Sequence, residues 1–139
     1  MNTQRQIKFR IWDKEHKKMR DVYSINGTTE GSTFIEYYNE EEEVKSSIHE
    51  NYELMQFTGL KDKNGVEIYE NDIVKWSSLK IGTCKEGFEN NYNYKNRIVN
   101  WSENKGCWIL DDEENWNLGI YDNIEIIGNI YEHSELLTK

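Results

Sequence analysis

Short segments in which apolar and polar residues alternate restrict the fold of this chain more than any other feature. In Gln6–Trp12, the apolar Ile7, Phe9 and Ile11 share one face of an extended chain. A period of two is typical of a half-buried β-strand. Pro and Ala are absent, and the β-prone Ile, Val, Thr, Tyr, Phe and Trp far outnumber Leu. This composition favours strands over helices, so the sequence predicts a mainly β protein.

Further segments of the same character follow along the chain. They are Met19–Ile25, Thr33–Tyr38, Tyr52–Thr58, Val66–Tyr69, Ile73–Trp76, Arg97–Trp101, Gly106–Leu110 and Asn123–Tyr131. The first of them returns from Gln6–Trp12 and predicts an N-terminal hairpin. About eight short strands at hairpin spacing predict antiparallel strands that form a small SH3-like barrel or a sandwich.

Three segments do not fit the strand pattern. Asn39–Glu50 is polar and is therefore expected to form a helix or a loop. Val44 and Ile48 are four residues apart, a spacing that favours an amphipathic helix. The Asn-rich Ser77–Asn96 predicts a long loop. Ser134 is expected to cap a short C-terminal helical turn.

The length of 139 residues suits one domain, residues 1–139. If the chain subdivides, the break is expected near Glu40–Asn51. This would give an N-terminal hairpin region, 1–50, and a barrel-like core, 51–139.

Turn chemistry is most evident in the middle of the chain. Asp62 is placed to accept hydrogen bonds from the backbone of Lys63–Gly65, and Gly65 supplies a positive φ. Glu70–Asp72 predicts a second tight turn.

Three blocks of the sequence resemble the YopX-like family of phage and prophage proteins from Gram-positive bacteria. The blocks are Lys8–Asp13 with Lys17–Met19, then Leu54–Gly65 with Glu67–Glu70 and Asp72–Val74, and finally Ile127–Glu132 with Glu135–Leu137. The resemblance implies a mostly β, phage-encoded protein that forms oligomers, and it brings no assigned activity. Asn71 stands where the family usually has Gly, and Asn tolerates the left-handed region that this turn needs. His133 and Ser134 stand where the family usually has Asn-Pro.

Within these blocks, structural roles are predicted rather than catalytic ones. The expected core anchors are Phe57, Ile68, Ile73 and Val74, the expected turn residues are Gly59, Asp62, Gly65 and Asp72, and Gly128 belongs to the third block.

No motif for catalysis, a cofactor or a metal is present, so we expect a protein that is not an enzyme. Cys84 and Cys107 are far apart, and His16, His49 and His133 are isolated. The turn from Asp62 onward resembles the start of a calcium loop, but the later positions lack the required Gly and Glu. Cys107 with His133 makes no triad without supporting geometry, and no glycine-rich phosphate loop occurs.

Charge is unevenly distributed. The net charge is −9, yet the first 20 residues carry seven bases and two acids. Acidic clusters occur at Glu40–Glu43 and Asp111–Glu114. They are expected either as solvated loops or as faces that meet a basic partner.

The aromatic content is the main functional signal. Five Trp and nine Tyr exceed what a core of this size hides, and such residues dominate protein interfaces. We therefore expect association, as a homo-oligomer or with a host or phage protein. One alternative is a nucleic-acid-associated regulator in which Lys8, Arg10, Trp12 and Lys14 form a basic patch, although the net charge makes nucleic acid a poor partner. Others are an acidic inhibitor of a host nucleic-acid enzyme and a sugar-binding face.

The N-terminal segment has no apolar region of the kind that a signal peptide needs, and no apolar run is long enough to span a membrane. The expected compartment is the cytoplasm of the bacterial host.

Overall fold

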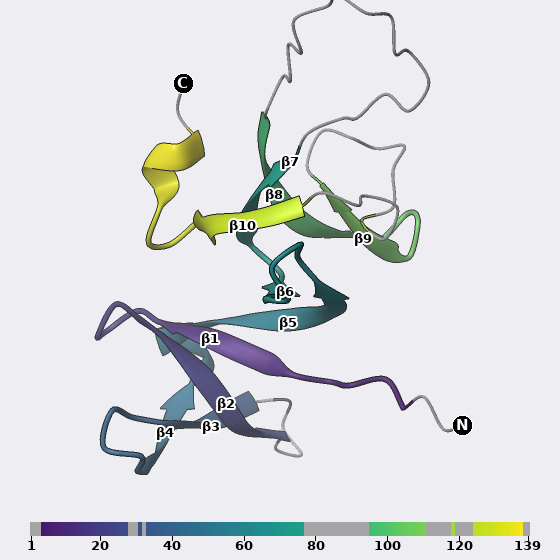
Figure 1. The fold of residues 1–139 in the computed structure, drawn as a ribbon. Coiled ribbons are helices and arrows are strands. Elements are labelled where there is room, and N and C mark those ends of the chain that lie inside the picture. Colours follow the sequence, from purple (N-terminus) through teal and green to yellow (C-terminus); the bar gives the residue numbers. More distant parts are fainter. Residues whose placement is uncertain are drawn as a thin grey trace, which may run out of the picture. The chain divides into compact units, whose positions relative to one another are not determined.

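The computed structural model describes residues 4–27, 31, 33–76, 95–110, 118 and 124–137 (Figure 1). The chain forms two compact units, residues 1–59 and 60–139. The division therefore lies after Gly59, C-terminal to the expected break at Glu40–Asn51. The reason is that the strand beginning at Tyr52 pairs with the first strand of the chain and completes the N-terminal sheet.

The first unit is an antiparallel sheet whose strands lie in the order β4-β3-β2-β1-β5. Its elements are β1 (Phe9–Asp13), β2 (Lys18–Gly27), β3 (Thr33–Tyr38), β4 (Val44–Ile48), a single 3₁₀ turn η1 (His49–Asn51) and β5 (Tyr52–Lys61). Strands β1 to β4 follow one another as hairpins, whereas β5 returns to the free side of β1. The predicted N-terminal hairpin is confirmed.

The expectation of a helix or loop over Asn39–Glu50 is wrong for Val44–Ile48, which forms strand β4. In the register with β3, Val44 lies opposite Tyr38, and Ile48 lies opposite Phe34. A spacing of four places two residues on one face of a strand as well as on one face of a helix. The partner strand decides between the two.

The core of the first unit lies on one face of this sheet. Ile11, Ile35, Tyr37 and Tyr52 are buried together, and Val22 packs against them. Each comes from an alternating segment, so the opposite face of the same strands is left for other contacts.

The second unit contains an open antiparallel sheet in the order β10-β7-β8-β9, made of β7 (Asp72–Trp76), β8 (Lys95–Ser102), β9 (Cys107–Leu110) and β10 (Ile124–Asn129). The end of β5 pairs with the short β6 (Glu67–Tyr69). The buried core comprises Ile68, Val74, Val99, Trp108, Leu110, Leu118 and Ile124. The 3₁₀ turn η3 (Ser134–Leu137) confirms the predicted C-terminal helical turn.

The mainly β, antiparallel fold is confirmed, and neither sheet closes on itself in the described part of the chain. The predicted loop Ser77–Asn96 lies outside the described residues up to position 94, and Lys95 and Asn96 already belong to β8. Among the described residues, no helix is long and apolar enough to cross a membrane.

Candidate interaction surface

The sheet of strands β2, β3 and β4 has one face turned away from the core. Ile35 and Tyr37 of β3 point inward and are buried. Because side chains alternate along a strand, the neighbouring residues of β3 point outward. We call this surface the outer face. By strand pairing its apolar members are Phe34, Tyr38, Val44 and Ile48, and its polar members are Ser24, Asn26, Glu36 and Ser46. Tyr23, at the register shift of β2, joins them through its ring contact with Tyr38.

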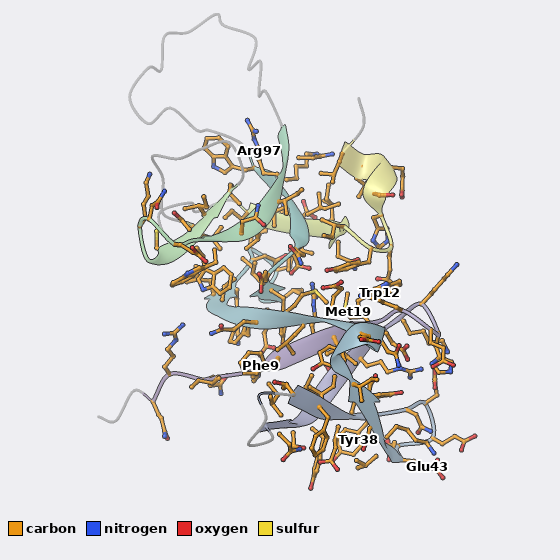
Figure 2. All side chains as sticks on the ribbon, turned by 180° about the vertical axis from the view of Figure 1, so that it is seen from behind. Phe9, Trp12, Met19, Tyr38, Glu43 and Arg97 are labelled. Atoms are coloured by element: carbon orange, nitrogen blue, oxygen red, sulfur yellow. The ribbon has the colours of Figure 1, made fainter. Side chains whose placement is uncertain are left out.

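Large apolar side chains on the outer face are exposed to solvent. The exposed fractions are 57% for Tyr23, 43% for Tyr38, 45% for Val44 and 59% for Ile48. The rings of Tyr23 and Tyr38 meet edge to face, with centroids 5.3 Å apart. Figure 2 shows Tyr38 near Glu43, at the end of the sheet where β3 turns into β4. Apolar groups at this density are typical of a surface that binds another macromolecule.

A polar group separates the two apolar ends of the outer face. Glu36 accepts hydrogen bonds from the Ser24 hydroxyl and from the Asn26 amide, and Asn26 also donates to Ser24 Oγ over 2.8 Å. Tyr23, Tyr38 and Val44 lie at one end of this group, and Phe34 and Ile48 lie at the other. The polar centre is thus already satisfied, and the two ends supply the apolar area.

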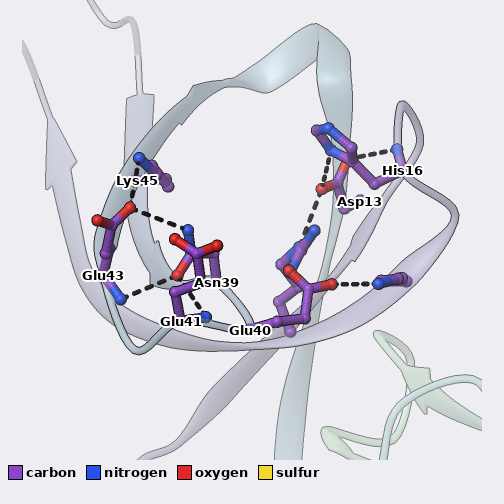
Figure 3. A network of polar contacts seen from close by, with 9 residues as sticks. Asp13, His16, Asn39, Glu40, Glu41, Glu43 and Lys45 are labelled. Carbon is purple, nitrogen blue, oxygen red and sulfur yellow. Dashed lines mark hydrogen bonds and ion pairs between the residues drawn. The ribbon is translucent and has the colours of Figure 1, made fainter.

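An ion-pair network built on the buried Arg20 and Asp13, with the exposed Glu40, Lys18 and His16 around them, links the hairpins that carry the outer face (Figure 3). The Arg20 side chain, on β2, donates from Nε to Asp13 Oδ2 over 3.0 Å and from Nη1 to Glu40 Oε2 over 3.1 Å. Asp13 Oδ2 also contacts His16 Nδ1 at 2.8 Å. Lys18 forms a second ion pair with Glu40. The network joins the β1–β2 hairpin to the turn between β3 and β4.

The partners in this network lower the pKa values of its two carboxyl groups, Asp13 and Glu40. Burial raises the pKa of Asp13, but hydrogen bonds from His16 and Arg20 outweigh it and hold the pKa below 3.8. Hydrogen bonds from Lys18 and Arg20 lower the pKa of Glu40 from 4.5 to about 2. Both carboxylates are therefore ionised near neutral pH. They offset the charge of Arg20, whose guanidinium lies over the Tyr37 ring, 5.1 Å from its centroid.

The turn between β3 and β4 is closed by its own side chains. Asn39 Oδ1 accepts hydrogen bonds from the backbone N–H groups of Glu41 and Glu43, over 3.0 and 2.9 Å. Glu42 adopts a left-handed φ of 59°. Lys45 pairs with Glu43 at 2.9 Å. Two of the four acids of the Glu40–Glu43 cluster are therefore neutralised within the protein.

The basic residues singled out in the sequence are distributed differently. Lys8, Arg10 and Trp12 are half-buried, and the Lys8 Nζ lies over the Phe57 ring, 5.6 Å from its centroid. Lys14 is exposed, but its Nζ lies 2.9 Å from Glu53 Oε1.

Acidic residues also lie beside Arg10 and Trp12. Across the strands, Arg10 lies opposite Asp21, and Trp12 lies opposite Glu53 and Met19 (Figure 2). Acids thus interleave with the bases on this part of the sheet.

The predicted turn residue Asp62 holds a corner of the second unit. Its Oδ1 accepts hydrogen bonds from the N–H groups of Asn64 and Val66, each over 2.9 Å, and its Oδ2 accepts one from Ile126 over 3.1 Å. Gly65 has a φ of 80°. The carboxylate is therefore engaged by three backbone donors, which gives Asp62 the structural role expected of it.

The second predicted turn connects β6 to β7. Asp72 Oδ2 accepts a hydrogen bond from the Tyr69 N–H over 2.8 Å. Asn71 has a φ of 65°, which confirms the left-handed conformation expected there. Its backbone N–H donates to Val99, and its carbonyl accepts from Ile130.

The remaining residues of the three blocks are buried or sit at special backbone positions. Phe57, Ile68, Ile73 and Val74 are buried. Gly59 has a φ of 85°. Gly128 lies at a register shift of β10, where a Cβ would come within 2.7 Å of the His133 ring.

The described residues contain no cluster of three or more His, Cys, Asp or Glu side chains placed to hold a metal ion. Cys107 is half-buried with a free thiol, and Cys84 lies outside the described residues. Asp111–Glu114 also lies outside them.

Sequence reasoning did not identify the outer face. The signal that could have found it is the run from Val44 to Ile48, in which apolar ends alternate with Ser46, directly after the strand Thr33–Tyr38. Two such runs joined by a polar turn are typical of a hairpin.

A mainly β architecture of two antiparallel sheets in the described residues defines the class of this protein. Its sequence matches the family model described as YopX protein over residues 8–138, and the chain therefore belongs to the YopX family. No functionally curated protein matches the chain.

Two solved structures share the fold. One is protein EF1440 from Enterococcus faecalis, with a TM-score of 0.61 and 24% identity over 96% of this chain and 99% of that one. The other is YopX from Bacillus subtilis, with a TM-score of 0.59 and 24% identity over 99% of both chains.

Proposed function

We propose that this protein is a non-catalytic, phage-encoded association module that binds another protein, a second copy of itself or a host protein, through the outer face. The observation that carries the proposal is the exposure of Tyr23, Tyr38, Val44 and Ile48 on one sheet face. Desolvating these side chains supplies the free energy of association. The phage origin, which the family resemblance implies, and the bacterial cytoplasm, which is the compartment expected from the sequence, are part of the same proposal.

The Tyr23–Tyr38 pair is the expected anchor. Tyrosine combines a large apolar ring with a hydroxyl that tolerates water, so it can be exposed in the free protein and buried in the complex. The two rings already contact each other, which reduces the side-chain entropy that binding must remove. The ion-pair network around Arg20 joins the β1–β2 hairpin to the turn between β3 and β4 and so ties together the strands that carry the outer face.

The test is retention of partner proteins by immobilised full-length protein, from a lysate of a Gram-positive host that also contains a labelled copy of the chain. The double variant Tyr23→Ser/Tyr38→Ser should retain roughly tenfold less of the bound partner than the wild type. Val66→Ser is the matched control, because Val66 is equally exposed but lies on a turn of the second unit. Equal retention by the wild type and the double variant would show that the outer face is not the binding surface.

A further inference from the structure

Strand β4 is an edge strand within the described residues, because the sheet order places β3 on one side of it and no strand on the other. An edge strand presents a row of backbone N–H and C=O groups to any strand that can add to it. On β4 this row borders the exposed apolar side chains of the outer face. The edge and the face together form one continuous surface.

The hydrogen-bond pattern shows which backbone groups of β4 point away from β3. The Asn39 N–H donates to the Glu43 carbonyl over 2.9 Å, just beyond the last register pair, Tyr38 and Val44. Antiparallel pairs alternate between hydrogen-bonded and non-hydrogen-bonded. Lys45 and Ser47 therefore bond to β3, and the backbone groups of Val44, Ser46 and Ile48 point outward.

From this geometry we infer that a second copy of the chain adds to β4, with the two β4 strands antiparallel about a two-fold axis at Ser46. The inference rests on the proposed function and identifies the partner. In this register Val44 lies opposite Ile48 of the partner subunit, and Ser46 opposite Ser46 of the partner subunit. All three outward-pointing residues then pair with outward-pointing residues, as a continuous antiparallel ladder requires.

Side-chain chemistry selects this register over its neighbours. Moving the axis to Lys45 would place two like charges opposite each other, which is destabilising. Moving it to Ser47 would place Ile48 opposite a serine. With the axis at Ser46, apolar residues meet apolar residues at both ends. The Tyr38 and Val44 end of one copy continues into the Ile48 and Phe34 end of the other.

The charge of Lys45 on β4 does not prevent another strand from adding to this edge. Lysine on an edge strand commonly prevents strand addition. Here Lys45 pairs with Glu43 at 2.9 Å. In the inferred register it lies opposite Ser47 of the partner subunit, so no charge is left facing a like charge.

The test is the oligomeric state of the full chain in solution, measured by sedimentation velocity across the micromolar range. The wild type should sediment as a dimer. Val44→Lys should raise the dimer dissociation constant by about 100-fold, because each dimer contains the altered pair twice. Val66→Lys, the same change at a site of similar exposure outside the outer face, should leave it unchanged.

Two further variants test the register itself. Ser46→Pro removes an N–H that points away from β3, so the subunit keeps its own ladder while the dimer weakens by at least about tenfold. Ser46→Cys, with Cys84→Ser and Cys107→Ser, should give a disulfide-linked dimer on oxidation, because hydrogen-bonded antiparallel pairs have Cα atoms about 5.5 Å apart. Lys105→Cys in the same background is the control, since it lies in an exposed turn.

The outcomes separate this inference from the proposed function. A monomer throughout, a Ser46→Cys variant that fails to cross-link, or equal effects of Val44→Lys and Val66→Lys would each overturn pairing through β4. The proposed function would still stand if retention of a host protein depended on Tyr23 and Tyr38. If that retention were also unaffected, both would be wrong.

Discussion

At the scale of single residues, Gly128 shows how a backbone position can be fixed by one distant side chain. It lies where β10 shifts register, and the His133 ring occupies the space that a Cβ would need. The His133 N–H donates to the Asn129 carbonyl over 3.0 Å, and Asn129 donates back to His133 Nδ1 over 3.3 Å. These two hydrogen bonds hold the ring against the glycine.

Replacing Gly128 with Ala should therefore destabilise the protein by about 1–3 kcal/mol, since a Cβ only 2.7 Å from the His133 ring forces the ring or the strand to move. Urea unfolding measures the loss. Gly27→Ala is the control, because nothing lies within 4 Å of the Cβ it would add, and it should change stability by less than about 0.5 kcal/mol. Equal stabilities would mean that His133 can leave the glycine at no cost.

The sequence predicts residue-scale features well where their cause is local. The sequence predicts a tight turn over Glu70–Asp72, and the family resemblance, with Gly usual at position 71, implies the left-handed conformation that the φ of 65° of Asn71 confirms. The contact between Gly128 and His133 could not be predicted, because neither residue type indicates that the His133 ring lies where a Cβ on residue 128 would be. It requires the bend of the chain after β10.

At the scale of elements, the Asp62 corner joins a local turn to a distant strand. Two of its three backbone donors, Asn64 and Val66, lie within the turn itself. The third, Ile126, lies 64 residues further along the chain, on β10. The Lys63 N–H also donates to the Ile124 carbonyl over 2.9 Å. The corner therefore ties β10 to the turn that precedes β6, within the second unit.

Asp62→Ala should destabilise the protein by about 2–3 kcal/mol, because three N–H groups lose their acceptor. Thermal unfolding monitored by circular dichroism measures the change. Lys63→Ala, which removes only an exposed ion pair with Glu125, should cost less than about 1 kcal/mol. If Asp62→Ala behaved like Lys63→Ala, water would be replacing the carboxylate fully.

The strands illustrate what a sequence pattern can and cannot decide. The sequence predicts the turn from Asp62 to Gly65 because the donors that close it lie within a few residues of Asp62, whereas the additional bond from Ile126 has no local signal. The spacing of Val44 and Ile48 is compatible with both a helix and a strand, and β3 supplies the deciding partner. The outer face was missed for the same reason, since it exists only once β2, β3 and β4 are side by side.

At the scale of the whole molecule, the free energy of unfolding should decrease at acidic pH. The pKa values of Asp13, Glu40 and Asp62 are lowered by folding. A group whose pKa is lower in the folded state stabilises that state above its unfolded pKa, and this contribution is lost as the pH falls toward the folded pKa. For Glu40, the window runs from 4.5 down to about 2.

Unfolding free energy should therefore be constant near neutral pH and decrease below about pH 4.5. Urea titrations at several pH values measure this dependence. Glu40→Gln should flatten the part of the curve that belongs to Glu40, because the amide does not titrate. A variant that retains the full wild-type slope would show that Lys18 and Arg20 do not hold Glu40 in solution.

The pairing of β5 with β1 has a consequence for synthesis on the ribosome. Strands β1 to β4 are joined by hairpins, so each pairs with a strand that is close to it in the sequence. Phe9 of β1 instead pairs with Gln56 of β5, which is synthesised much later. While the later strand is still inside the exit tunnel, one side of β1 has emerged without its neighbour. The nascent chain thus carries a temporary open edge, which closes only when translation has passed β5.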